Sequence, residues 1–437
     1  MKSILNRQTE LQGKREQCAL LKRNDIILAE NQYYSMDDYK TRCNNNVIVV
    51  GSPGCGKTTG IVEPNIMQAY GSYIISDPKG KLYRKYSKYL RGKGYAVQVL
   101  DMTQPQCSSH YNPFQFLHST QDVMRMAYTI SYQKKNVCKS DPFWDQAATL
   151  LLSALIDYLK RCCEPKLNTL HHLARLISMC YVGDAAQESE ADIMMEELEE
   201  AEPGCFAVSQ YKKFRTAPAK TLQSILITAN AKMADLDFPE LNQMTGRCDI
   251  DFKQIGRKPT AVFVVISDTD RSMDTIASLF FTQAFQELCS YADKECTDGR
   301  LLIPVRFIMD DFATNVCVDE YPRIASCIRS RNISSMIILQ GEGQLKAAYG
   351  NEAETIISSA DTYVYMGGND IETAKSVAVR ADLPVHDILS QPIGYTRIFR
   401  RGSKAVYARN FDMELHKDLF QAHENSLVEK LYFLCRN

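Results

Sequence analysis

The stretch Gly51-Ser52-Pro53-Gly54-Cys55-Gly56-Lys57-Thr58 is a complete G-x-x-x-x-G-K-[ST] phosphate-binding loop. It follows the short β-branched run 47–50, which is typical of a buried parallel strand, and it precedes a stretch that can begin a helix. Glycines let the backbone curve around a polyphosphate, so that the N–H groups of the loop and of the helix start point at negative charge. A chance match between a strand and a helix is uncommon, so the stretch predicts nucleotide binding rather than a glycine-rich turn.

Two side chains of the loop have predicted chemical roles. Lys57 is expected to reach the β- and γ-phosphates of ATP, and Thr58 is expected to hold Mg²⁺. The predicted nucleotide contacts are Gly51, Ser52, Pro53, Gly54, Cys55, Gly56, Lys57, Thr58 and Thr59.

Composition limits the possible functions. The chain has 437 residues, enough for about three domains of ~150 residues. Lys and Arg number 51 against 52 Asp and Glu, a net charge of −1, so any DNA contact must come from local basic patches. Fifteen cysteines, an odd number without a C-x-x-C pair, indicate free thiols in a reducing cytoplasm, not disulfides or a zinc site.

The sequence indicates neither a signal peptide nor a membrane span. The longest apolar candidate, residues 276–288, is interrupted by Gln283, Gln286 and Glu287 and is expected to form a buried or amphipathic helix. We therefore expect a cytoplasmic protein.

Strand and helix patterns alternate at both ends of the chain. Residues 45–115 show a βαβαβ pattern with predicted helices at 57–70 and 80–93, and the α/β pattern resumes from residue 260. The predicted strands are 47–50, 73–76, 96–100, 261–266, 305–309, 336–339 and 363–366, followed by a hairpin of 395–399 and 405–409. The pattern predicts an α/β fold with a mostly parallel sheet.

The sequence pattern changes in the middle of the chain, where helical periodicity dominates from residue 140 to 236 and strand patterns are absent. The predicted helices are 143–158, 167–179, 188–200 and 219–233. The third is very acidic, which favours a solvated face, with docking of a basic partner as the alternative. The predicted domains are a polar N-terminal segment at 1–44, a nucleotide-binding domain at 45–139 and 237–437, and an all-α insertion at 140–236. The first of these is expected to be a solvated helix with a short strand at 26–28, or a segment that follows a membrane anchor.

A second acidic site is predicted at Phe307-Ile308-Met309-Asp310-Asp311, an apolar strand that ends in two carboxylates. Asp310 is expected to hold Mg²⁺ as a Walker B aspartate, and Asp311 to orient or deprotonate the attacking water. Many such ATPases have Glu at the second place, so it stays open whether Asp311 is the base. The structural alternative is an Asp turn at a strand end.

Three other positions are candidates for the same site. Gln340, at the end of the predicted strand 336–339, suits a γ-phosphate sensor of RecA-like motors, or a strand cap. Arg331, or its neighbour Arg329, suits an arginine finger for an adjacent subunit, or is an ordinary surface arginine. Asp77 follows the second predicted strand and lies near the nucleotide or only in a turn.

Two basic clusters are candidate DNA contacts, with solvated charge as the alternative. The first is Lys212, Lys213, Arg215 and Lys220. The second is Arg397, Arg400, Arg401, Lys404 and Arg409, in and beside the C-terminal hairpin.

Taken together, the motifs resemble the conjugative coupling proteins, the TraG-type ATPases of type IV secretion, in the branch found in Gram-positive mobile elements. The matching segments are 51–59, 77–80 with Leu82-Tyr83, 110–114, 141–144, 219–221 with 224–226, 307–315, Gln340 with Gln344-Leu345, 349–350 and 365–368. The resemblance implies a RecA-like P-loop motor domain with an all-α domain inserted into it. By position it assigns ATP and Mg²⁺ binding to Lys57 and Thr58, the Walker B pair to Asp310 and Asp311, and the third motor motif to Gln340, and it favours Arg331 as the finger.

The resemblance also implies hexamers around a central channel, DNA-stimulated ATP hydrolysis, and export of relaxase-bound single-stranded DNA or protein substrates through type IV secretion channel components. Relatives usually begin with membrane-spanning helices, and this sequence shows none. We therefore expect either a cytosolic portion or a soluble variant recruited to the cytoplasmic face of the membrane by a partner, monomeric in isolation.

The predicted function is an ATP-driven translocase, and the alternative is a nucleotide-gated cargo receptor with little translocation activity. Another motor on the same core, such as a chromosome-partitioning or virion-packaging ATPase, is disfavoured by the position of the helical block. A small-molecule kinase is the least favoured, because no lid-like arginine cluster follows the loop.

Overall fold

The computed structural model describes residues 21–132, 142–181, 188–314 and 316–416, which form two compact units. Unit 1 comprises residues up to Val99, Asp251–Ile266 and the chain from Phe285 onwards, and unit 2 comprises Leu100–Ile250 and Ser267–Ala284. Unit 2 thus starts earlier and ends later than the expected insertion at 140–236. Much of the predicted N-terminal helix, together with Asp141 and Asn315 of the motif segments, lies outside the described residues.

Unit 1 contains a nine-stranded sheet in the order β11-β10-β9-β3-β8-β7-β4-β6-β5. Strands β9, β3, β8, β7, β4 and β6 are parallel, whereas β10 pairs antiparallel with both β9 and β11. The strands are β3 Val47–Val50, β4 Ser72–Pro78, β5 Ala96–Asp101, β6 Thr260–Ile266, β7 Val305–Met309, β8 Ile333–Leu339, β9 Thr362–Tyr365, β10 Tyr395–Arg400 and β11 Val406–Arg409. The predicted α/β fold with a mostly parallel sheet is confirmed.

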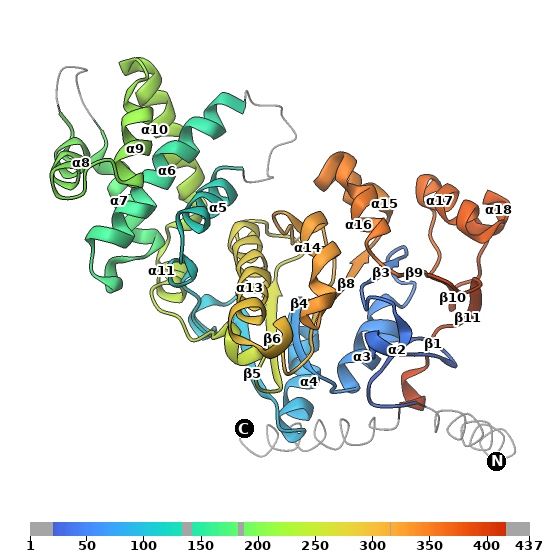
Figure 1. Ribbon diagram of the computed structural model, residues 1–437. Coiled ribbons are helices and arrows are strands. Elements are labelled where there is room, and N and C mark those ends of the chain that lie inside the picture. The colour runs from blue at the N-terminus through green and yellow to red at the C-terminus, as the bar shows by residue number, and fades with distance from the viewer. Residues whose placement is uncertain (1–20, 133–141, 182–187, 315, 417–437) are drawn as a thin grey trace, which may run out of the picture. The chain divides into compact units, whose positions relative to one another are not determined.

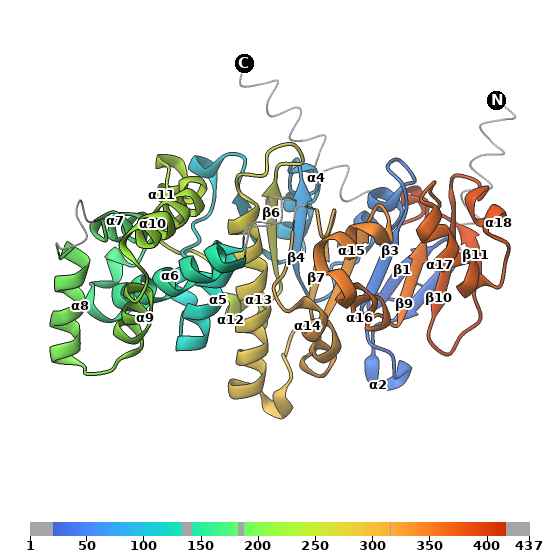
Figure 2. The same cartoon turned by 90° about the horizontal axis from the view of Figure 1, so that it is seen from above.

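Helices cover both faces of this sheet, as Figures 1 and 2 show. The helices of unit 1 are α2 Asp38–Thr41, α3 Glu63–Met67, α4 Lys81–Gly92, α12 Phe252–Ile255, α14 Tyr321–Cys327, α15 Glu342–Tyr349, α16 Ala353–Ser358, α17 Ile371–Ala381 and α18 Val385–Leu389. A short antiparallel hairpin, β1 Asp25–Ala29 with β2 Gln32–Ser35, contains the strand expected at 26–28.

The central strands β3, β6, β7, β8 and β9 are mostly apolar because both of their faces are buried. In β8, Met336 and Ile338 pack with α3 and α4, while Ile337 and Leu339 point to the opposite face. On that opposite face Phe285 of α13 stacks on Phe307 of β7, with ring centroids 3.6 Å apart. Helix α13, Asp274–Glu295, contains the apolar stretch predicted to be a buried helix. In the described part of the chain, no helix is both long and apolar enough to span a membrane.

Unit 2 is largely helical, as the periodicity of the middle segment predicts. Its helices are α5 Thr120–Ser131, α6 Pro142–Cys162, α7 Leu170–Met179, α8 Glu190–Ala201, α9 Phe206–Arg215, α10 Ala219–Met233 and α11 Pro239–Thr245, with the first half of α13. Helix α6 is buried along most of its length and packs on α5, α7, α9 and α10. Helices α5, α9 and α11 were not expected from the sequence.

Candidate functional site

The phosphate-binding loop connects β3 to a helix that begins at Thr58. Its first turn, Thr58–Val62, is a π-helix that continues into α3. Gly54 and Gly56 have φ of 81° and 92°, in the left-handed region that side chains other than glycine rarely adopt. A Cβ atom on Gly51 would lie 2.6 Å from Cys55 Sγ, so this glycine is needed for close packing inside the loop. The loop therefore has the curved backbone that a phosphate cradle requires.

Lys57 folds back over the loop. Its ammonium group donates hydrogen bonds to the carbonyl oxygens of Gly51 and Ser52, the latter at 3.0 Å. The loop is also fixed from the neighbouring strand, because the Ser52 N–H donates to the Gly367 carbonyl, just after β9, at 2.9 Å. Lys57 is thus held above the loop, in reach of any anion that the loop binds.

Thr58 and Asp310 come together from elements far apart in sequence. The Thr58 hydroxyl donates to Asp310 Oδ2 at 3.3 Å, and Ser76 in β4 donates to the Asp310 carbonyl at 2.9 Å. Burial, and secondarily the charge of Asp311, raises the pKa of Asp310 to about 6. Hydroxyl and carboxylate oxygens are the ligands that Mg²⁺ prefers, and a bound cation would favour the ionised form of Asp310 and so offset its raised pKa. These residues therefore fit a magnesium ion.

Asp311 and Gln340 form the next link at the same edge of the sheet. Asp311 Oδ1 accepts a 3.1 Å hydrogen bond from Gln340 Nε2, and the Asp311 backbone has φ of 52°, a strained value for a non-glycine residue. Gln340 follows β8, which lies between β3 and β7 and pairs with both. The carboxyl ends of β3, β8 and β7 thus lie side by side, and hydrogen bonds link Thr58 to Asp310, Asp310 to Asp311, and Asp311 to Gln340.

Residues whose roles sequence reasoning missed complete this arrangement. Gln344 accepts from the Gln340 backbone N–H at 2.9 Å and donates to Thr314 Oγ1 at 2.9 Å, which fixes the chain beside Gln340. Asn410, just after β11, donates to the Cys55 carbonyl of the phosphate loop at 3.0 Å. No local motif marks Asn410, because its partner lies 355 residues earlier in the chain.

Asp77 lies at the carboxyl end of β4, but its carboxylate is occupied within its own segment. It accepts hydrogen bonds from the backbone N–H groups of Leu82 and Tyr83, at 3.1 and 2.7 Å, in the first turn of α4. Asp77 therefore stabilises the turn between β4 and α4, which is the second of the two roles expected from the sequence.

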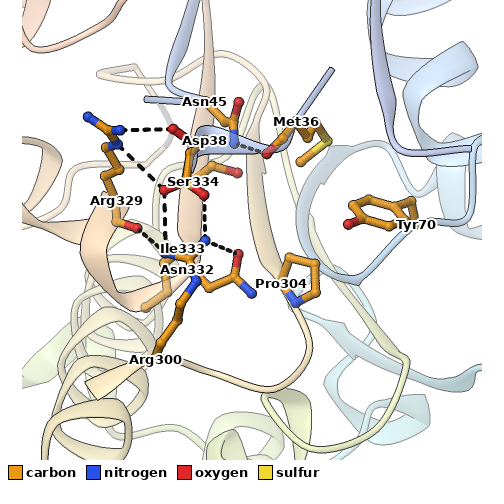
Figure 3. Close-up of a pocket in the computed structure, with 10 residues that line it drawn as sticks. All are labelled: Met36, Asp38, Asn45, Tyr70, Arg300, Pro304, Arg329, Asn332, Ile333 and Ser334. Atoms are coloured by element: carbon orange, nitrogen blue, oxygen red, sulfur yellow. Dashed lines mark hydrogen bonds and ion pairs between the residues drawn. The ribbon is translucent and has the colours of Figure 1, made fainter. Parts of the chain in front are cut away.

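Arg331 is not brought together with the other candidate residues. It precedes β8, at the amino ends of the strands, and its guanidinium makes two 2.8 Å hydrogen bonds to the carboxylate of Asp293 in α13. Arg329 and Arg300 belong to the same edge, where both pair with Asp38 (Figure 3). The space that this ionic cluster encloses is about 20 Å³, room for about one water molecule.

The fold and the site define a P-loop protein of the RecA-like type, with the phosphate-loop strand and the acidic strand separated by one further strand. The family model of type IV secretory system conjugative DNA transfer matches residues 2–380. The chain therefore belongs to this family, as its motifs predicted.

The chain is also similar to solved structures. The bacterial conjugative coupling protein TrwBdeltaN70, in an unbound form, is 16% identical with a TM-score of 0.68, over 92% of this chain and 91% of that one. The plasmid coupling protein TrwB in complex with ADP and Mg²⁺ is 16% identical with a TM-score of 0.65, over 91% and 92%. VirB4 of Thermoanaerobacter pseudethanolicus is 14% identical with a TM-score of 0.53, over 89% and 96%. At these identities the likeness shows a shared fold. A comparison with curated protein sequences found no match.

Proposed function

We propose that this chain is the ATP-hydrolysing motor of a conjugative coupling protein. It recruits relaxase-bound single-stranded DNA or protein substrates and drives their transfer into a type IV secretion channel. The observation that carries the proposal is the row Thr58, Asp310, Asp311 and Gln340 at one edge of the sheet, beside a loop shaped for phosphates. Membership of the conjugative DNA transfer family supports the choice of cargo.

Each residue of the row has a proposed task. The loop N–H groups bind the β- and γ-phosphates of ATP, and Lys57 turns its ammonium from the carbonyls of Gly51 and Ser52 towards the γ-phosphate. Thr58 and Asp310 hold Mg²⁺, which when bound neutralises charge that develops on the phosphates. Asp311 orients the attacking water or accepts its proton, and Gln340 senses the γ-phosphate through its contact with Asp311.

The nucleotide-gated cargo receptor remains the second candidate, and a groove in unit 2 favours it. Helices α8 and α9 line an open cavity of about 650 Å³ with an apolar floor of Met195, Val208 and Tyr211. Its rim has the carboxylates of Glu188, Glu196 and Glu200, whereas Asp192 and Glu199 are paired with Arg215 and Lys212. Such a surface suits a basic segment of a cargo protein.

The two candidates differ in turnover. We would measure the ATPase rate of the purified protein with and without single-stranded DNA, beside Lys57→Ala and the matched control Lys166→Ala, whose side chain is exposed in unit 2. The motor predicts DNA-stimulated hydrolysis that Lys57→Ala abolishes and Lys166→Ala preserves. ATP binding without hydrolysis in either condition contradicts the motor and favours the receptor.

A further inference from the structure

The hairpin of β10 and β11 has a charge that the nucleotide site does not use. From residue 395 to 409 it contains five cationic side chains and no carboxylate, in a chain whose net charge is −1. Asp361 neutralises one of the five through its 3.1 Å ion pair with Arg401. The hairpin is therefore a local basic surface of the kind that binds polyanions.

Its outer face combines two of these cations, Arg397 and Arg409, with aromatic rings. The antiparallel register places Tyr395 opposite Arg409 and Arg397 opposite Tyr407, so all four share one face of the hairpin. The other face is apolar, because Ile398, Val406 and Ala408 pack into the core.

The four side chains stack in a row. Arg409 lies 5.9 Å from the ring centroid of Tyr395, the rings of Tyr395 and Tyr407 are parallel to within 14° at 5.1 Å, and Arg397 lies 4.5 Å from the centroid of Tyr407. Tyr407 is 45% exposed. Proteins that bind single-stranded nucleic acid use such planar groups to stack bases, with cations alongside for the phosphates.

The hairpin is hydrogen-bonded directly to the phosphate-binding loop. The buried hydroxyl of Thr396 in β10 donates to Asn410 Oδ1 at 2.6 Å, and Asn410 Nδ2 donates to the Cys55 carbonyl at 3.0 Å. A Cβ atom on Gly56 would lie only 3.2 Å from Asn410 Nδ2, so loop and hairpin are in close contact. A shift of the hairpin would thus reach the backbone that holds the phosphates.

We propose that the outer face of β10–β11 binds single-stranded DNA, with bases stacked on the Arg–Tyr row and phosphates on its cations. We further propose that Thr396 and Asn410 transmit this binding to the phosphate loop and so raise the rate of ATP hydrolysis. The transmission rests on the proposed motor function, whereas the DNA contact does not. An anionic membrane is the competing ligand, because Ile393 beside β10 is 86% exposed.

The DNA contact is tested by fluorescence anisotropy with a labelled oligo-dT strand, without nucleotide, over a range of salt concentrations. Replacing two phosphate contacts with Arg397→Gln and Arg409→Gln should reduce the salt slope of log K by about 1.4. Tyr407→Ala, at an exposed ring, should weaken binding about tenfold. Arg323→Gln, at an exposed arginine of α14, is the matched control and should bind as wild type does.

Unchanged affinity and salt slope in both hairpin variants would overturn the DNA contact. If the double variant Lys212→Gln, Lys213→Gln loses affinity for the oligonucleotide and the hairpin variants do not, the hairpin is not the binding site and α9 binds the DNA instead. Sedimentation with phosphatidylserine vesicles that depends on the hairpin, without oligonucleotide binding, would overturn it in favour of a membrane.

The transmission is tested with Thr396→Val, which removes the hydroxyl, and Thr396→Ser, which keeps it. Thr396→Val should retain oligonucleotide affinity but reduce the ratio of DNA-stimulated to unstimulated ATPase rates towards one, while Thr396→Ser should keep the wild-type ratio. A normal ratio in Thr396→Val, or an equal loss in both variants, would overturn the transmission. If DNA does not stimulate the ATPase of the wild-type protein, both the transmission and the motor are overturned. The binding test would still decide the DNA contact.

Discussion

Charged side chains lie at both edges of the parallel sheet, but their surroundings differ. At the carboxyl ends of the strands, Asp310 and Asp311 are adjacent, and burial with this second charge raises the pKa of Asp310. At the amino ends, Asp38 is paired with Arg300 and Arg329, and hydrogen bonds join the three residues. The carboxyl edge thus keeps uncompensated charge for a ligand, as open α/β sheets do, and the amino edge uses charge to hold the fold together.

The largest expected effect is on hydrolysis at the carboxyl edge. Asp310→Asn should lower the ATPase rate about 10³-fold, or about 4 kcal/mol of activation free energy, because the amide cannot neutralise a magnesium ion. Steady-state phosphate release measures the rate, with Glu354→Gln, an exposed carboxylate of α16, as the control. A rate within threefold of wild type would contradict the assignment of Asp310.

The same substitution should stabilise the protein without nucleotide. The pKa of Asp310 is about 6 in the folded protein against 3.8 as its ordinary value, so the folded state binds this proton more tightly. The stabilisation that the proton on Asp310 gives the folded state is therefore fully present below pH 3.8, and it is lost as the pH rises through 6. Asp310→Asn should gain about 3 kcal/mol at pH 8, and the gain should shrink towards pH 4.

Urea unfolding at several pH values, in the absence of Mg²⁺, measures this difference. A gain that does not depend on pH would show that the raised pKa of Asp310 is not its source.

A change at the amino edge should lower stability and leave the ATPase rate unchanged, the opposite of the change at Asp310. Asp38→Ala leaves Arg300 and Arg329 without their carboxylate and should cost about 2 kcal/mol of unfolding free energy. The ATPase rate per folded molecule should stay within twofold of wild type, since no residue of the row is touched. Thermal unfolding and a rate corrected for folded protein check both statements, and a large loss of rate would break the contrast between the edges.

The smallest effect is expected for Arg331→Ala in the dilute, isolated chain. The partly exposed pair with Asp293 should contribute less than about 1 kcal/mol to stability, and hydrolysis should not change. Arg331 stays a predicted finger for a neighbouring subunit. That role requires a loss of hydrolysis that appears only at protein concentrations where the chain assembles, which rate measurements against concentration and light scattering would show.

Much of the fold was predictable, because its signals are local. The apolar runs at β3, β6 and β7 predicted strands to within one residue of their observed bounds, whereas β8 begins three residues before the predicted 336–339. Helix α9 was missed, although its residues pack closely on α6, because two lysines and an arginine in its last turn obscure its apolar face. The boundaries between the two units could not be predicted from the sequence either, because one continuous helix, α13, contributes one half to each unit.

The sequence by itself determined the phosphate loop, the two carboxylates after β7 and the glutamine after β8, because glycine spacing and short apolar runs act over a few residues. Only the tertiary structure decided which of these meet. The insertion of β8 between β3 and β7 brings Gln340 to Asp311 and leaves Arg331 at the opposite edge. It also joins Asn410 to Cys55, since pairing between distant strands sets contacts that no local pattern encodes.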